Sequence, residues 1–258
     1  MNELTVIGLD YATDPRRVGM ALGRWRRDTR LRVIAVETGR EQSPASIVSR
    51  WLRDHSEPAL IAIDAPLGWP SALGEALRPH RAGDELKGDA NDLFRRATDQ
   101  EIQNTVGIRP LDVGSNLIAR TAHAALKILH EIRDMTARPI PLAWRHDGIA
   151  ETTAIEVYPA ATLHAHGVTH KGYKKQSQGN IRQEVFCALL SHLSLCQEPN
   201  CQEKRSIKES ACGNADILDG LVCLLAAKDF LDGKAMAPRD LDRAKQEGWI
   251  WSLPRQNP

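Results

Sequence analysis

Two short apolar runs that each end in an aspartate constrain this chain more than any other feature. They cover residues 4–10 and 58–64, and they end at Asp10 and Asp64. Runs of this kind are typical of buried strands, and the Pro- and Gly-containing segment at 65–70 stops the second run abruptly. Catalytic and ligand groups in open α/β sheets gather at the carboxyl ends of the strands. Asp10 and Asp64 are therefore the first candidate site residues.

The pattern around these runs predicts an α/β fold. Two further strand candidates, residues 17–25 and 31–37, follow the first run with no helix between them. Ser43 is a favourable N-cap and Pro44 suits the first helical position, so a helix is predicted from there to about His55. We expect a mixed sheet of five strands, with three antiparallel opening strands and then parallel strands, flanked by helices.

Residues 71–148 are polar and helical in pattern, which predicts a helical insertion between strands four and five. Residues 197–213 are predicted to form a mobile loop. The chain 1–258 is then a single domain. The other expected elements are helices at 91–103 and 115–135, a fifth strand at 152–158, and helices at 181–195 and 216–231.

Composition excludes several classes of protein. Across 258 residues, 34 Lys and Arg face 33 Asp and Glu, so neither a strongly basic nucleic-acid tail nor an acidic solvating domain is present. No apolar window of about 18 residues and no signal-peptide pattern occurs, so we expect a cytoplasmic protein that does not enter membranes. The five cysteines form no C-x-x-C pair and are interpreted as reduced thiols rather than zinc ligands.

The closing helix carries the next candidates. Asp216 and Asp219 lie three residues apart and share a helix face, and Asp219 is the only charged residue between 217 and 227. Asp216 could simply assist the helix start, and Asp219 could lie at the rim. An ionised carboxylate among apolar neighbours is costly to bury unless it is paired or binds a metal, and Gly220 leaves room for close approach. Carboxylate oxygens favour Mg²⁺ or Mn²⁺ over zinc.

Glu156 is a further candidate, because it lies between apolar neighbours in the predicted fifth strand. It could face outward on an alternating strand, or serve as another metal ligand or a base. Several carboxylates that converge on one sheet end could hold two cations about 3.5 to 4 Å apart, an arrangement that cleaves phosphodiesters. The acids therefore predict a metal-dependent hydrolase.

Seven motifs in one order resemble domain-of-unknown-function family 429, whose members are predicted nucleases of ribonuclease H-like fold. The resemblance spans nearly the whole chain, and it implies that fold and a nuclease activity. The Asp216 and Asp219 pair is also similar to the helix pair of Holliday-junction resolvases of that fold. Gly220 departs from the alanine expected of the family. The motifs are Ile7-Gly-Leu-Asp10, Ile63-Asp-Ala-Pro-Leu-Gly68, Arg96-Ala-Thr-Asp99, Glu156-Val-Tyr-Pro159, Gly172-Tyr-Lys174, Asp216-Ile-Leu-Asp-Gly-Leu-Val-Cys223 and Glu247-Gly-Trp-Ile-Trp251.

Two polar segments are candidate substrate contacts. Arg96 and Asp99 could form a helical surface pair worth about 0.3 to 0.5 kcal/mol, while the family resemblance implies a substrate-facing role with Arg96 on a phosphate. Tyr173 and Lys174 lie in a cationic segment that could follow a phosphate backbone, with Tyr173 stacked on a base, or that could be a solvated loop. The histidines at 164, 166 and 170 are interpreted as core or surface residues, and residues 249–251 as the cover of an apolar face.

The preferred hypothesis is a nuclease that uses Mg²⁺ or Mn²⁺ and acts on nucleic acid or another phosphodiester. Asp10 is the expected bridging ligand, Asp64 and Asp219 flank it, Asp216 assists, and Glu156 is an extra ligand or base. One alternative is an ATP-using phosphotransferase or ATPase, whose phosphate loop residues 8–13 resemble, although that class needs two such domains. The other is a non-catalytic nucleic-acid-binding module. The oligomeric state stays open.

Overall fold

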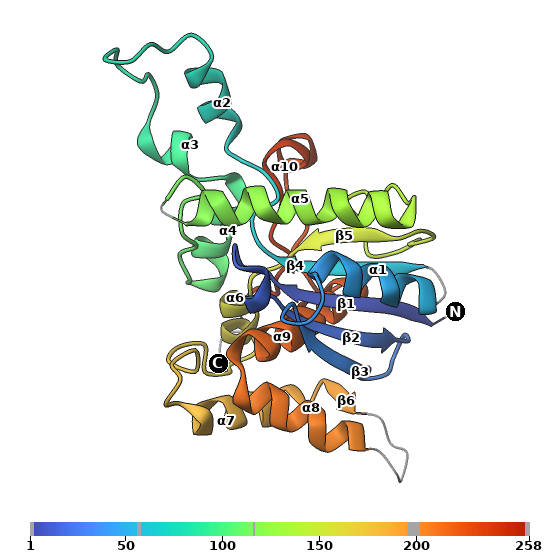
Figure 1. Ribbon diagram of the computed structural model, residues 1–258. Coiled ribbons are helices and arrows are strands. Elements are labelled where there is room, and N and C mark those ends of the chain that lie inside the picture. Colours follow the sequence, from blue (N-terminus) through green and yellow to red (C-terminus); the bar gives the residue numbers. More distant parts are fainter. Residues whose placement is uncertain (1–2, 56–57, 116, 196–201, 256–258) are drawn as a thin grey trace.

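The computed structural model describes residues 3–55, 58–115, 117–195 and 202–255, and it is built on a mixed six-stranded sheet flanked by helices (Figure 1). The strand order is β5-β4-β1-β2-β3-β6. The strands are β1 Leu4–Asp10, β2 Gly19–Trp25, β3 Leu31–Thr38, β4 Ala59–Asp64, β5 Thr153–Glu156 and β6 Leu193–Leu195.

The strand directions confirm the mixed sheet. β1, β2 and β3 form consecutive antiparallel pairs, whereas β4 runs parallel to β1 and β5 runs parallel to β4. The predicted count of five is wrong, because β6 pairs in parallel with β3. The helix expected at 181–195 ends at Leu189 as α7 (Gly179–Leu189), and the alternating Leu193 and Leu195 then pair with the edge strand.

Helices cover both faces of the sheet (Figure 1). α1 (Pro44–Asp54) and α5 (Ile118–Thr136) pack on the face that carries Ile7 and Ile61. The opposite face, which carries Val6 and Leu60, is covered by α9 (Ala215–Leu231) with α6 (Pro159–Ala165), α7 and α8 (Gln202–Gly213). Alternate residues of β1 and β4 therefore pack into two separate hydrophobic cores, because successive side chains of a strand point to opposite faces.

Local signals set the helix starts. The Ser43 hydroxyl accepts from the Ser46 amide at 3.2 Å and Pro44 occupies the first turn of α1, which confirms that predicted start. The helix expected at 91–103 is instead two helices, α3 (Ala90–Phe94) and α4 (Ala97–Val106). Arg96 is extended and is the N-cap of α4, so the chain turns there. The predicted loop at 197–213 is also wrong in part, since α8 begins at Gln202 and residues 196–201 lie outside the described residues.

Glycines let α9 lie directly on the sheet. A Cβ atom at Gly8 would lie 2.2 Å from the Gly220 carbonyl oxygen, and one at Gly19 would lie 1.8 Å from that of Asp216. Both strand positions therefore accept only a hydrogen atom, and the N-terminal half of α9 contacts β1 and β2 backbone to backbone. This close approach, expected at Gly220, brings Asp219 under the end of β1.

The segment between β4 and β5 is helical, with α2 (Ser71–Leu77) and α3 projecting away from the sheet and α5 lying along it (Figure 1). Its treatment as an insertion in a single domain stays a prediction. The remaining elements are the 3-10 helix η1 (Pro15–Arg17) and α10 (Leu241–Glu247).

Among the described residues, no single helix is both long and apolar enough to cross a membrane. One bent pair of helices, residues 206–213 and α9, is long and apolar enough when the two are taken together. The pair is bent by 111°, and the finding rests on length and composition alone.

Candidate active site

Asp10 and Asp64 lie side by side at the carboxyl ends of neighbouring parallel strands. They are direct partners in the β1–β4 register, and each is the last residue of its strand. Asp219, in the second turn of α9, comes close to both from the helix face and is fully buried. The fold therefore brings together three acids that are more than 200 residues apart at the extremes, as their placement on strand ends and on the helix predicts.

Burial and mutual repulsion disfavour the charged forms of these acids. Burial raises the pKa of Asp10 well above its usual value, and the charges of Asp219 and Asp64 raise it further. Burial likewise raises the pKa of Asp64 to about 7, although Lys174 acts in the opposite direction. The pKa of Asp219 is raised for the same reason. No backbone or side-chain N–H of the described residues donates a hydrogen bond to the carboxylate of Asp10 or Asp64.

Lys174 supplies the positive charge for this group. Its ammonium lies 2.6 Å from Asp219 Oδ2, while its side chain is 60% exposed. Burial acts to lower the pKa of Lys174, yet the three carboxylates raise it above its usual value. One monovalent cation on a largely exposed side chain thus faces three acids, so its withdrawal would not require any element to unfold.

Tyr173 fixes the segment that carries Lys174. Its hydroxyl donates to Asp219 Oδ1 at 2.6 Å, and its side chain is 1% exposed. Neither alternative for Tyr173, stacking on a base or a place in a solvated loop, agrees with this burial, because the ring is in the core. Arg182 holds the same segment by donating to the carbonyls of Tyr173 and Lys175 at 2.9 and 2.8 Å. The sequence reasoning missed Arg182, whose only signal is a cation between apolar positions of α7.

Asp216 lies at the edge of the group. It occupies the first turn of α9, where Asn214 rather than Asp216 is the N-cap and accepts from the Asp216 amide at 2.8 Å. Its carboxylate lies 3.8 Å from Arg17, and its half-buried position raises its pKa. It contributes negative charge to the pocket, since it raises the pKa of Asp10 as well.

Arg96 and Glu156 form a separate buried cluster with Asp99. The guanidinium is 1% exposed and binds Glu156 in a bidentate manner at 2.9 and 2.7 Å. It also donates to both oxygens of Asp99, at 3.1 and 2.9 Å, and to the Glu247 carbonyl at 3.2 Å. All five N–H donors of Arg96 are then used.

This cluster corrects the interpretation of Arg96 and Asp99 as either an exposed pair or a phosphate contact. Arg96 is buried and has no donor left for a phosphate. Glu156 also accepts from the Leu67 amide at 2.9 Å, so both of its oxygens are engaged by protein groups. We therefore assign these three residues to support rather than to ligand binding: they fix the segment that follows Asp64.

Glu247 is a second support that the sequence reasoning did not single out by itself. Its fully buried carboxylate accepts from the Ser71 amide and hydroxyl at 3.0 and 2.8 Å and from the Ala97 amide at 2.8 Å. Arg243 pairs with it at 3.0 Å. The available signal was its place at the start of the last family-like motif.

A cavity of about 260 Å³ opens above the acids. Asp10 and Asp64 line it together with Lys174, and Asp219 lies behind them. Tyr11 and Tyr158 contribute aromatic walls, and the exposed Leu111 belongs to the rim. The result is a polar floor with apolar sides, the usual composition of a small-ligand site.

The predicted histidines and cysteines lie outside this cavity, whereas Ile250 lines it together with the fully hydrogen-bonded Arg96, Asp99 and Glu156. His166 binds Asp229 at 2.7 Å, and the rings of His164 and His170 pack with their centroids 4.7 Å apart. Residues 249–251 are buried, which confirms that they cover an apolar face. Cys187, Cys212 and Cys223 are free thiols, while Cys196 and Cys201 lie outside the described residues.

The donor set suits a hard divalent cation. Asp10, Asp64 and Asp219 offer only carboxylate oxygens, the ligands that Mg²⁺ and Mn²⁺ prefer, and their pKa values are raised first by burial and then by neighbouring carboxylates. Within the described ranges no three Asp, Glu, His or Cys residues are grouped so that they could hold one metal ion, and the Lys174 ammonium lies against Asp219. A metal would therefore require Lys174 to withdraw.

Comparison with solved structures finds T. thermophilus RuvC in complex with a Holliday junction substrate, at 11% sequence identity and a TM-score of 0.34. The match covers 88% of this chain and 97% of that chain. At that TM-score the similarity transfers neither fold family nor function. A search of curated protein sequences finds no match.

The family comparison is more extensive. A family model described as protein of unknown function (DUF429) matches residues 8–243, which contain the three acids, Lys174 and the Arg96 cluster. The chain belongs to the DUF429 family.

Proposed function

We propose that this protein is a divalent-metal-dependent phosphodiester hydrolase of ribonuclease H-like fold that acts on nucleic acid. One observation carries the proposal: three carboxylates, Asp10, Asp64 and Asp219, converge at one sheet end with a single ammonium, on a largely exposed side chain, as their counterion. An acid group of this kind costs free energy unless it binds a cation, and the family match does not by itself supply an activity.

Asp10 and Asp64 face the cavity and would hold the metal, with Asp219 behind them once Lys174 withdraws. Bound Mg²⁺ or Mn²⁺ supplies Lewis-acid polarisation of a phosphoryl oxygen and lowers the pKa of a coordinated water. Asp216 adds negative charge near Asp10. The residues therefore provide the hard oxygen ligands, and the sheet provides their alignment.

Lys174 has a second task in this proposal. Its stem is exposed and its ammonium is already at the cavity, so on leaving Asp219 it can contact a phosphate of the substrate. Tyr173 remains hydrogen-bonded to Asp219 and keeps that carboxylate oriented. This retains the predicted substrate-binding role of Lys174 and replaces the stacking role of Tyr173 with a positioning role.

The cavity walls favour a nucleotide unit as substrate. Tyr11 and Tyr158 line it beside the acids, and aromatic faces stack on bases without sequence preference. The Arg96, Asp99 and Glu156 cluster and Glu247 keep the segment after Asp64 in place. They act through that segment and do not need to touch the substrate.

The test is cleavage of end-labelled single-stranded DNA, double-stranded DNA and RNA in Mn²⁺. We expect the wild type to cleave at least one of these substrates, and the Asp10→Asn and Asp64→Asn variants to lose at least about 100-fold in rate, as removal of a transition-state charge contact does. Asp14→Asn is the matched control, because Asp14 is partly exposed and does not line the cavity, and Asn keeps its N-capping ability. Undiminished cleavage by Asp10→Asn overturns the proposal.

A further inference from the structure

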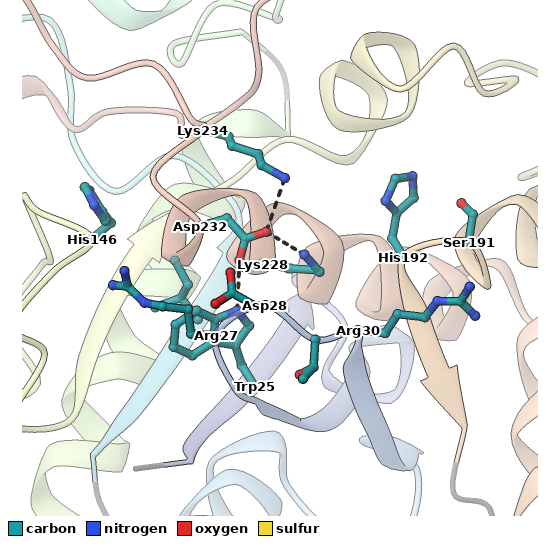
Figure 2. A pocket seen from close by; sticks show the side chains of 12 residues that line it. Trp25, Arg27, Asp28, Arg30, His146, Ser191, His192, Lys228, Asp232 and Lys234 are labelled. Carbon is teal, nitrogen blue, oxygen red and sulfur yellow. Dashed lines mark hydrogen bonds and ion pairs between the residues drawn. The ribbon is translucent and has the colours of Figure 1, made fainter. Parts of the chain in front are cut away.

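A second cavity lies at the opposite end of the sheet from the acids (Figure 2). Its volume is about 440 Å³, within the range of small-ligand sites. It is bordered by the turn after Trp25, where β2 ends beside the start of β1, and by the C-terminal end of α9. His146 and His192 complete the wall from two further segments. Four parts of the chain that are distant in sequence thus build one cavity.

Cations outnumber acids around this cavity. It is lined by Arg27, Arg30, Lys228 and Lys234, against Asp28 and Asp232. These four positive and two negative side chains leave a net charge of +2 before either histidine is protonated. In a chain with a net charge of only +1, this is a local concentration of positive charge.

Some of the charged side chains around this cavity are paired with one another. Asp232 pairs with Lys228 at 2.5 Å and with Lys234 at 3.5 Å, and it also accepts from the Trp25 indole at 3.1 Å (Figure 2). Lys228 also lies in the last turn of α9, where the helix dipole favours a cation. Lys228 and Asp232 are therefore explained by the fold, and Lys234 shares an acid that is already paired.

The two arginines are not explained in that way. Within the described residues Arg27 has no hydrogen bond or ion pair, and Arg30 reaches only the Leu190 carbonyl at 3.3 Å. Both arginines lie in the short turn between β2 and β3, and their guanidinium groups lie on opposite sides of the cavity (Figure 2). Asp28 between them has a positive φ of 61°, a conformation that keeps the turn tight and both arginines at the cavity.

We propose that this cavity binds a small phosphorylated anion, independently of the acid site and of the function proposed for it. Guanidinium groups bind phosphate oxygens in a bidentate manner, and Lys234 and Ser191 add donors from the other segments. The limited volume of about 440 Å³ favours a small ligand over an extended polymer, which would need a groove.

Calorimetric titration with inorganic pyrophosphate tests the proposal. The titration is done in EDTA and at constant ionic strength, so that no metal-bridged contact at the acids contributes. The wild type should bind saturably, and Arg27→Ala and Lys234→Ala should each weaken binding about tenfold, the ratio that corresponds to about 1.4 kcal/mol. Arg26→Ala is the matched control: it removes the same charge from the same exposed turn, but Arg26 does not line the cavity.

The outcomes separate the alternatives. Weakening by Arg27→Ala with an unchanged Arg26→Ala supports the site. Absence of saturable binding, equal weakening by Arg26→Ala, or an affinity for pyrophosphate no higher than that for sulfate overturns it. Binding of a single-stranded oligonucleotide that is lost in Arg27→Ala, with no binding of pyrophosphate, also overturns it in favour of a nucleic-acid contact.

Discussion

Two buried acid clusters lie next to each other at the same end of the sheet, and they are built in opposite ways. Around Arg96, every guanidinium N–H is used, and the carboxylates of Glu156 and Glu247 accept further backbone hydrogen bonds. Around Asp10, three carboxylates share one ammonium, and no N–H of the described residues donates to the carboxylates of Asp10 and Asp64. The first cluster is satisfied by the protein, whereas the second still lacks positive charge.

This difference separates the acids that stabilise the fold from the acids that are available to bind a ligand. A satisfied cluster stabilises, and removing one partner leaves a buried charge unpaired. An unsatisfied cluster reduces stability and persists where a ligand supplies what is missing. The same substitution, carboxylate to amide, should therefore have opposite effects on stability in the two clusters.

The largest expected effect is that of Glu156→Gln. It leaves the Arg96 charge buried with Asp99 alone and should lower the free energy of unfolding by about 3 to 5 kcal/mol. Urea denaturation measures it. Glu37→Gln is the control, because Glu37 pairs with Arg50 at 2.6 Å on a partly exposed surface and should cost less than about 1 kcal/mol. Equal losses in the two variants would mean that the Arg96 cluster has no special structural role.

The second expectation concerns pH. Burial raises the pKa of Asp64 to about 7, so between pH 4 and 7 the folded protein holds a proton that the unfolded chain has lost. Stability without metal should therefore fall as pH rises through this window, by up to about 4 kcal/mol, since one pKa unit is worth about 1.4 kcal/mol.

Thermal unfolding in EDTA from pH 5 to 8 shows this as a difference between the wild type and Asp64→Asn. The variant lacks the titrating group, so its unfolding temperature should fall less over the same range. Parallel pH profiles would show that Asp64 does not hold the proton.

A smaller effect of opposite sign to that of Glu156→Gln is expected for Asp10→Asn. The amide removes a charge that burial, Asp219 and Asp64 all disfavour. At pH 8 in EDTA the variant should be more stable than the wild type by about 1 kcal/mol or more, the value of a single pKa unit. Urea denaturation at pH 8 decides the sign. Destabilisation of the size seen for Glu156→Gln would place Asp10 among the structural acids.

The smallest effect is expected for Arg243→Met. Arg243 is partly exposed, and Glu247 keeps its bonds to Ser71 and Ala97 without it. The loss should be below about 1 kcal/mol, as for other partly exposed ion pairs. A larger loss of unfolding free energy in urea denaturation would show that the buried charge of Glu247 depends on Arg243 for its stabilisation.

Patterns local in sequence predicted the unsatisfied cluster well. Asp10 and Asp64 end apolar runs, and Asp219 interrupts an apolar helix, so each is marked by its own neighbours. Strand direction then brings them together, because parallel strands have their carboxyl ends at one edge. The start of α1 was likewise predictable from Ser43 and Pro44.

The satisfied cluster could not be predicted in this way. Arg96 and Glu156 are 60 residues apart, and Arg96 reaches the Glu247 carbonyl across 151 residues. A charged residue is as common on a surface as in such a network, so no local pattern separates the two cases. The short β6 was missed for a similar reason, because three residues that pair only with an edge strand leave little periodicity to detect.

The central claim is that the Asp10 cluster takes a divalent cation, and Mn²⁺ binding measured by electron paramagnetic resonance of the free ion tests it most directly. We expect saturable binding by the wild type and by Asp14→Asn, and loss of that binding in Asp10→Asn and Asp219→Asn while both variants remain folded by circular dichroism. Wild-type protein that leaves all Mn²⁺ free, or Asp10→Asn and Asp219→Asn variants that bind it as the wild type does, would contradict the account.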